Sequence, residues 1–462
     1  MHLLTAGAAR AQDSGPNIIY LMLDEWGYYE QSALGHPTLQ TPNIDAFARE
    51  GMRFTQALAG APVCGPTRVS LMLGQHTGHT SMRGNGGYDP IRADDVTIAQ
   101  VLKDAGYATG GFGKWGCGGR GTSGTPETHG FDDFLGYYDQ RHAHTYYPTY
   151  LIHNGEELPL QGNTGSPYQG ETFSHYVMWD AAMDWLDEHK DEPFFLYLPL
   201  TVPHGLWGMP EDDPAWGEFA DKPWTAGQRR DTDARTYAAM LLMVDRQLGE
   251  LIEKLKAQGL DDNTIIFVCG DNGGQDYFHN NHQYPRGFFA PNVDPRTGVE
   301  FRGQKTQLWE GGLRIPMMVR WPGHIEAGTQ SDLLWYFPDV MPTLAQLAGG
   351  QAPEHTDGLS ILPTLLGEGE QQQHEALYWE YGRQIAVRIG DWKAIKPGRG
   401  ADWQLYDLSS DISETTDVAA QHPDILARAI AIAQREHEPV EPGEVYDREL
   451  AEKDHTVPVR HE

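Results

Sequence analysis

The sequence is poor in cysteine and in positive charge. Its 462 residues include only three cysteines, Cys64, Cys117 and Cys269, too few for a disulfide framework. With 34 Lys and Arg against 65 Asp and Glu, the formal net charge is −31, which argues against nucleic acid or an anionic membrane surface as a partner. No apolar run approaches the roughly 20 residues that a membrane-spanning helix needs. Such a composition is typical of a secreted or periplasmic enzyme.

The first residues carry a pattern seen in exported proteins. Residues 1–14 contain a short apolar patch, and Ala9-Arg10-Ala11 then precedes a polar stretch. An A-x-A pattern in this place resembles the end of a bacterial secretory signal, and the alternative is a disordered tail. We therefore expect a periplasmic or secreted protein.

Short apolar strands alternate with amphipathic helices over most of the chain. This alternation predicts an α/β domain at 15–350, a large mixed but mostly parallel sheet sandwiched by helices. The expected strands are 17–23, 107–112, 194–200 and 264–270, and the clearest helical patterns are 43–54, 97–106 and 236–259.

The pattern changes near residue 350. Four short strands with turns between them precede one helix, which predicts a smaller C-terminal domain of antiparallel strands plus a helix, with a polar tail, at 351–462. The expected elements are strands 376–381, 384–389, 391–396 and 403–408 and the helix 422–437.

Polar residues follow each strand of the large domain. Ligands bind at the carboxyl ends of parallel strands, so residues distant in sequence should meet at one edge of the sheet. These residues are Asp24, Glu25, Lys114, His204, Asp271 and Asn272. Asp24, Glu25, Asp271 and Asn272 offer oxygen ligands, which suit Ca²⁺ or Mg²⁺ better than zinc. Singly, each acidic residue could instead be a turn former or a helix cap.

The stretch APVCGPTRVSLMLG, residues 61–74, has the features of an anion site. Pro66 fits the first turn of a helix and Gly74 can end it, which puts Cys64 at the N-terminus, where backbone N–H groups attract anions. Arg68 can turn toward the same side. The alternative is a buried structural cysteine, but this would not explain the spacing of Pro66 and Arg68 from Cys64. A thiolate nucleophile fits poorly, because cysteine phosphatases use a longer cradle between Cys and Arg and need no metal.

The pentapeptide CGPTR resembles the C-x-P-x-R signature of type I sulfatases of the alkaline phosphatase superfamily. In these enzymes the cysteine is oxidised to Cα-formylglycine after translation. Other blocks resemble the family in the same order along the chain: PNIIYLMLDEWGYYE, GYATGGFGKWG, VPH, GDNGG, KTQLWEGGLRIPMMVRWPG and LYDLSSDISETTDVA.

The resemblance implies a role for each site residue. Asp24, Glu25, Asp271 and Asn272, with the side chain at position 64, would bind a divalent cation, Ca²⁺ or alternatively Mg²⁺. A formylglycine hydrated to a gem-diol at position 64 would attack the sulfur. Arg68 and Lys114 would orient it, while His204 and Lys305 would contact the ester and His204 would protonate the leaving alcohol. Biogenesis would need a formylglycine-generating enzyme or an anaerobic sulfatase-maturing enzyme.

Two positions depart from the family pattern. Glu25 stands where the family usually has Asp, and Gly116 stands where many members have a His that acts on the diol. Position 116 therefore leaves the base for release of sulfate unassigned. Nearby His142 and His144 are candidate substrate contacts, and either could replace the missing imidazole; we expect His142 to do so. The alternative is a surface loop with incidental histidines.

The expected function is hydrolysis of a sulfate ester on a carbohydrate, of galactose or hexosamine type. Aromatic residues in the loops 204–219 and 280–289 could stack on sugar rings or could anchor the loops. Two other functions remain open: a phosphonate monoesterase or phosphodiesterase of the same superfamily, and a silent glycan-binding homologue that never acquires formylglycine.

Overall fold

The computed structural model describes residues 15–224, 234–278 and 289–456. The proposed signal remnant at 1–14 and most of the aromatic loop 280–289 lie outside these ranges. Among the described residues, no helix is both long and apolar enough to span a membrane.

The large domain is built on a sheet of ten strands in the order β11-β2-β10-β9-β1-β8-β4-β5-β6-β7. Its centre, β9-β1-β8-β4-β5, is entirely parallel, and antiparallel pairs flank it on both sides. The predicted mixed, mostly parallel sheet is therefore confirmed. The strands are β1 (Asn17–Leu23), β2 (Met52–Phe54), β4 (Ala108–Lys114), β5 (Asp133–Tyr137), β6 (Tyr150–His153), β7 (Glu156–Pro159), β8 (Phe194–Pro199), β9 (Thr264–Gly270), β10 (Met317–Arg320) and β11 (Thr329–Ser331). A separate short pair joins β3 (Ala57–Leu58) to β12 (Trp335–Tyr336).

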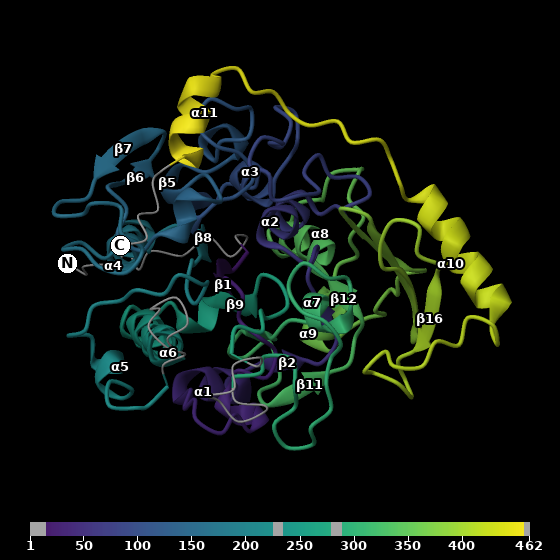
Figure 1. Cartoon of the computed structure of the whole chain (residues 1–462). Coiled ribbons are helices and arrows are strands. Elements are labelled where there is room, and N and C mark those ends of the chain that lie inside the picture. Colours follow the sequence, from purple (N-terminus) through teal and green to yellow (C-terminus); the bar gives the residue numbers. More distant parts are fainter. Residues whose placement is uncertain (1–14, 225–233, 279–288, 457–462) are drawn as a thin grey trace, which may run out of the picture.

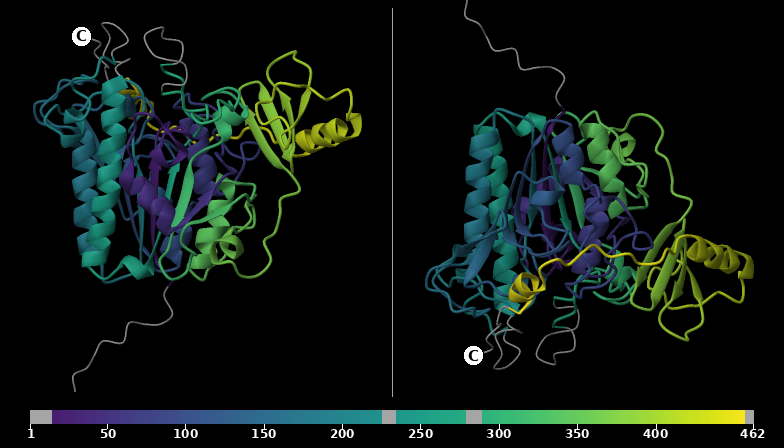
Figure 2. Two further views of the ribbon diagram at one scale, coloured as in Figure 1. Left: turned by 90° about the horizontal axis from the view of Figure 1, so that it is seen from below. Right: turned by 90° about the horizontal axis from the view of Figure 1, so that it is seen from above.

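Helices cover both faces of this sheet (Figures 1 and 2). Alternate residues of β1 show the reason: Ile19 and Leu21 belong to one buried apolar cluster, while Ile18 and Tyr20 belong to another. The first cluster includes α4 and α6, and the second includes α2, α3 and α8. The helices of the large domain are α1 (Pro42–Glu50), α2 (Cys64–Leu73), α3 (Ile98–Asp104), α4 (Ser174–His189), α5 (Pro214–Gly217), α6 (Ala234–Ala257), α7 (Glu310–Leu313), α8 (Val340–Leu347) and α9 (Leu362–Leu366).

The helix predicted over 43–54 is shorter than expected. It ends at Glu50, and Met52 begins β2, which pairs with β10. Gly51 allows this change because a side chain there would meet the backbone oxygen of Val319 at 2.3 Å. Tertiary pairing with a strand far along the chain thus overrides the helical pattern.

The small domain is an antiparallel sheet of four strands with one helix packed on it. Its elements are β13 (Leu377–Tyr381), β14 (Gln384–Ile389), β15 (Trp392–Lys396), β16 (Gln404–Asp407) and α10 (Pro423–Arg435). Its extent differs from the predicted 351–462 at both ends. Leu362 and Leu365 of α9 pack in the core of the large domain. The tail after α10 returns to the large domain as α11 (Arg448–His455) (Figure 1). There Asp454 accepts hydrogen bonds from Arg120 and Tyr150.

A group of buried charges joins the two domains, and we name it the interdomain cluster. Glu310 of α7 contacts Arg314 at 2.6 Å, Lys393 at 3.1 Å and Arg388 at 3.4 Å. Glu414 completes the cluster, with one carboxylate oxygen 2.9 Å from Lys393 and the other accepting from the backbone N–H of Glu310. All five side chains are buried, so each charge is balanced by direct contact rather than by water.

Candidate active site

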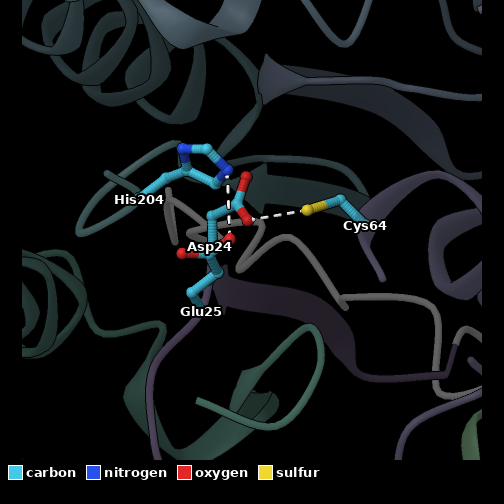
Figure 3. A group of neighbouring side chains, drawn as sticks. All are labelled: Asp24, Glu25, Cys64 and His204. Atoms are coloured by element: carbon cyan, nitrogen blue, oxygen red, sulfur yellow. Dashed lines mark hydrogen bonds and ion pairs between the residues drawn. The ribbon is translucent and has the colours of Figure 1, made fainter. Parts of the chain in front are cut away.

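The polar residues at the strand ends meet at one edge of the large sheet, together with the start of α2. Asp24 and Glu25 follow β1, Lys114 ends β4, and Asp271 and Asn272 follow β9. All five are buried. Figure 3 shows Asp24 in contact with Cys64, and Glu25 in contact with His204, which follows β8.

Cys64 is the first residue of α2 and is fully buried. The preceding Val63 is extended, and Gly74, with φ of +65°, ends the helix, as the positions of Pro66 and Gly74 predict. The thiol donates to Asp24 Oδ1 at 3.1 Å. Burial, reinforced by Asp24, raises the pKa of the Cys64 thiol well above its ordinary value. The unmodified side chain is therefore a neutral thiol, which opposes its action as a thiolate.

Two cations bind the carboxylates of this site. Arg68 Nη2 lies 3.0 Å from Asp271 Oδ2 and 3.4 Å from Asp24 Oδ2, and Lys114 Nζ lies 2.7 Å from Asp24 Oδ2. Arg68 Nη1 also donates to the backbone oxygen of Lys114 at 2.6 Å, which ties α2 to the end of β4. Burial alone would raise the pKa of Asp24, but Lys114, His204 and Arg68 outweigh it and hold the pKa well below its ordinary value.

The donor set fits a hard divalent cation. Burial, followed by the neighbouring charge of Asp24, raises the pKa of Asp271 to about 7, although Arg68 contacts both carboxylates. Asn272 Oδ1 is buried and has no hydrogen-bond partner among the described residues. Ligand atoms of Asp24, Glu25, Cys64 and His204 lie within 4.8 Å of one another. Oxygen ligands of this kind suit Ca²⁺ or Mg²⁺.

Glu25 connects the acidic side of the site to a second pair of basic groups. Its backbone has φ of +68°, and its N–H donates to Asp271 Oδ1 at 3.0 Å. Glu25 Oε1 contacts Lys305 Nζ and lies 3.1 Å from His204 Nε2, which in turn lies 3.1 Å from Lys305 Nζ. Burial lowers the pKa of His204. The hydroxyl of Tyr277 donates a hydrogen bond to Glu25 Oε2, and no sequence motif predicts this contact.

The structure separates the two candidate histidines. His142 is packed between Tyr137 and Tyr150, and its Nε2 contacts the backbone oxygen of Tyr150 at 3.0 Å. His144 stacks on His204 with ring centroids 4.5 Å apart. Burial, with His204 and Lys114, lowers the pKa of His144 to about 2. Its Nε2 has no hydrogen-bond partner in the described part of the chain. Geometry therefore brings His144, rather than the expected His142, to the site.

The loop aromatics of 204–219 are anchors. Trp207 is buried in the core and contacts Tyr237 and Tyr277, and Trp216 packs against the same apolar cluster. The indole of Trp207 is therefore fixed in the core, whereas Trp216 is partly exposed and also contacts Arg235 through its ring.

A second group with metal-ligating side chains lies between the domains at His76, His79 and Glu436. His76 Nδ1 accepts from the backbone N–H of Gly78 at 3.1 Å, and its Nε2 lies 3.3 Å from Glu436 Oε2. In this arrangement the group joins the domains by polar contacts.

Comparison with known proteins agrees with the geometry. A family model described as Sulfatase matches residues 16–350, and one described as N-sulphoglucosamine sulphohydrolase, C-terminal, matches residues 302–431. An arylsulfatase of Hemicentrotus pulcherrimus is 30% identical over 85% of this chain and 69% of its own. An N-acetylgalactosamine-6-O-sulfatase of Bacteroides thetaiotaomicron is 29% identical over 89% of this chain and 91% of its own.

Solved structures share the whole architecture. The crystal structure of Ps i-CgsB superposes with a TM-score of 0.76 at 27% identity, covering 96% of this chain and 98% of its own. The same protein has also been solved in complex with k-i-k-neocarrahexaose.

Proposed function

The chain belongs to the sulfatase family of the alkaline phosphatase superfamily and is a sulfuric ester hydrolase, and on this premise we propose that it removes sulfate from a sulfated carbohydrate by means of a formylglycine formed from Cys64. The observation that carries the proposal is the position of Cys64, at the start of α2 and against Asp24, with Arg68 and Lys114 beside it. Hydrated formylglycine supplies a nucleophilic hydroxyl and a second hydroxyl for release of sulfate.

The surrounding side chains have complementary tasks. Arg68 and Lys114, fixed by Asp24 and Asp271, present positive charge to an entering sulfate and orient the hydroxyls at position 64. Next to them, His204 and Lys305 lie 3.1 Å apart and can contact the ester oxygen, where His204 delivers a proton to the leaving alcohol. The catalysis is then mainly positioning and charge stabilisation, as in phosphoryl transfer.

Asp24, Glu25, Asp271 and Asn272, with the side chain at position 64, would hold one divalent cation, which we propose to be Ca²⁺. The support is the oxygen donor set, the Asn272 Oδ1 that has no hydrogen-bond partner among the described residues, and the raised pKa of Asp271 beside Asp24. A cation bound there supplies further positive charge next to the sulfate oxygens. Ca²⁺ coordination also tolerates the longer side chain of Glu25 better than the octahedral geometry of Mg²⁺.

The proposed substrate is a sulfated sugar of galactose or hexosamine type. Support comes from the relatives, which include N-acetylgalactosamine-6-sulfatases, and from Ps i-CgsB, solved with a neocarrahexaose. A panel of defined sulfated galactose and hexosamine saccharides, scored by released sulfate, tests this assignment. We also propose that the protein acts in the periplasm or outside the cell, where its acidic composition is typical, and cell fractionation checks this location.

The deciding experiment is mass spectrometry of the peptide covering residues 61–68, from protein made together with a formylglycine-generating or an anaerobic sulfatase-maturing enzyme. We expect the mass of formylglycine at position 64 and release of sulfate that Cys64→Ala abolishes. Persistent cysteine at position 64 would instead identify a silent glycan-binding homologue. Faster turnover of an aryl phosphonate than of an aryl sulfate would favour a phosphonate monoesterase.

A further inference from the structure

Gly116 leaves a space beside the site that another residue fills. It lies two residues after Lys114, and its backbone has φ of +77°, in the left-handed region. A Cβ at this position would lie 2.1 Å from Gln140 Nε2 and 3.1 Å from Arg68 Cδ. The amide of Gln140 therefore occupies the place where a side chain at position 116 would begin, and the two cannot be present together without a shift.

Gln140 is held by only one end of its amide. The side chain is buried, with the residue 3% exposed, and Nε2 donates to the backbone oxygen of Gly116 at 3.2 Å. Its Oε1 is buried and has no hydrogen-bond partner among the residues that the structure describes. An unpaired amide oxygen in the interior is costly, so this atom is available to a ligand or to a hydroxyl that is not present in the unmodified chain.

The amide lies beside the N-terminal turn that carries the nucleophile. A Cβ on Gly65, the residue directly after Cys64, would lie 3.5 Å from Gln140 Nε2. On the other side, Arg68 links α2 to the Lys114 carbonyl at 2.6 Å. Gln140 thus lies between the start of α2 and the end of β4, the two elements that present position 64 and Lys114.

The segment that carries Gln140 is fixed by the C-terminal helix. Asp139 Oδ1 accepts from the backbone N–H of Arg141 at 2.7 Å, and Asp139 Oδ2 lies 3.0 Å from Nδ1 of His455 in α11. Four residues after Gln140, His144 stacks on His204. The backbone at position 140 is therefore anchored on both sides, which an orienting side chain requires.

We propose that Gln140 is a positioning residue for the nucleophile: its free amide oxygen accepts a hydrogen bond from a hydroxyl of the hydrated aldehyde at position 64, in the place that Gly116 leaves open. This inference rests on the proposed function, because cysteine has no such hydroxyl. An amide oxygen accepts a hydrogen bond but takes up no proton near neutral pH, so Gln140 orients the diol and is not the base that releases sulfate.

The first test is Gln140→Met, which keeps the length of the side chain and removes both polar atoms. A matched control is Gln31→Met, because Gln31 is equally buried, its Nε2 donates to the Tyr28 carbonyl at 3.0 Å and its Oε1 is also unpaired among the described residues. At equal formylglycine occupancy, measured by mass spectrometry, we expect kcat to fall about 10- to 100-fold in Gln140→Met with KM nearly unchanged. The Gln31→Met variant should keep the kcat of the wild type.

The second test does not depend on turnover. An aminooxy probe reacts with the free aldehyde and not with its hydrate, so a hydrate stabilised by Gln140 reacts slowly. We expect the rate of oxime formation to rise several-fold in Gln140→Met and to stay at the wild-type value in Gln31→Met.

The third test is an exchange of the two side chains. Gly116→His alone should lower the melting temperature of the unmodified Cys64 protein, because the new Cβ meets Gln140 Nε2. The double variant Gly116→His/Gln140→Gly should have a higher melting temperature than Gly116→His alone. After maturation it should also have a higher kcat than Gly116→His.

The outcomes separate the two proposals. Suppose that the wild type carries formylglycine and releases sulfate. If Gln140→Met then has the same kcat and the same rate of oxime formation, the proposed function is retained and the role of Gln140 is overturned. Equal losses of kcat in Gln140→Met and Gln31→Met also overturn it, because the effect is then merely structural. A wild type in which position 64 stays cysteine overturns both proposals.

Discussion

The molecule contains two buried groups of charges that resemble each other in composition and differ in completeness. The interdomain cluster combines Glu310 and Glu414 with Arg314, Arg388 and Lys393. At the sheet edge, Asp24, Glu25 and Asp271 are combined with Arg68, Lys114 and Lys305. All side chains of both groups are buried except Lys305, which is partly exposed. The formal charge is +1 for the interdomain cluster and 0 for the group at the sheet edge.

The difference lies in the polar atoms left without a partner. In the interdomain cluster, Glu414 Oε1 is the one atom without a hydrogen bond among the described residues, and it lies 2.9 Å from Lys393. Around the site, Arg68 Nε, Asn272 Oδ1, Gln140 Oε1 and His144 Nε2 are all unpaired among those residues. Unpaired buried polar atoms cost stability, and a bound group at the sheet edge would give these four atoms partners. Charge burial alone does not distinguish a binding site from a structural contact.

The largest effect should come from replacing a positively charged side chain at the site. Lys114→Met takes away the ammonium 2.7 Å from Asp24, and we expect kcat/KM for sulfate release to fall by about 10³-fold or more. The measurement uses folded protein of known formylglycine content, with unfolding followed by calorimetry. Unchanged kcat/KM in this variant would contradict the assignment of Lys114.

The matched change in the interdomain cluster should act on stability instead. Lys393→Met leaves Glu310 and Glu414 without their shared ammonium, which breaks buried pairs and costs about 3 kcal/mol or more. We expect a lower melting temperature, with kcat of the remaining folded protein close to that of the wild type. A loss of activity as large as that of Lys114→Met would contradict the view that the interdomain cluster acts on stability and not on catalysis.

Removal of Ca²⁺ should lower the melting temperature through the group at the sheet edge and not through the interdomain cluster. With Ca²⁺ at about 100 times its dissociation constant, binding to the folded state adds about 2.7 kcal/mol, so calorimetry with Ca²⁺ and with a chelator should show a clear shift in melting temperature. The shift should persist in Lys393→Met and disappear in Asn272→Leu. An equal shift in Asn272→Leu would place the cation elsewhere.

A smaller effect should separate the two histidines. His144 stacks on His204, so we expect His144→Ala to lower kcat/KM about tenfold, as for a residue that assists binding or proton transfer. His142→Ala should lower melting temperature and leave kcat/KM unchanged, because that ring packs between two tyrosines. The reverse result would restore the role that the sequence suggested for His142.

The smallest effect is the pH dependence of the interdomain cluster. Burial alone would raise the pKa of Glu310, but Lys393, Arg314 and Arg388 outweigh it and lower the pKa. A carboxyl group with a depressed pKa stabilises the fold above its unfolded value of about 4.3, and this contribution is lost as pH falls below that value. The wild type should therefore melt higher than Glu310→Gln at pH 7, with a gap that narrows on acidification. A constant gap from pH 7 to pH 3 would contradict this.

Much of the scaffold could be predicted because it is encoded locally. The apolar runs of β1 and β9 end where Asp24 and Asp271 begin, and Pro66 and Gly74 delimit α2. The helix expected through Gly51 was wrong in its last residues, since pairing of β2 with β10 depends on a strand far along the chain.

The contacts of individual side chains could not be predicted from the sequence. Gln140 and His144 stand in one short stretch with His142, and nothing in the order of residues says which of them reaches the site. The C-terminal tail likewise gives no sign that His455 will contact Asp139, because that contact joins segments 316 positions apart.

The sequence by itself determined the family, the mostly parallel sheet and the residues at its strand ends, because strand periodicity, helix starts and metal-ligand types are written in adjacent residues. Only the tertiary structure decided that His144 and not His142 faces His204, that Gln140 fills the space beside Gly116, and that the tail returns to fix this segment. The physical reason is that such contacts depend on the distance between side chains from different elements, which no local pattern specifies.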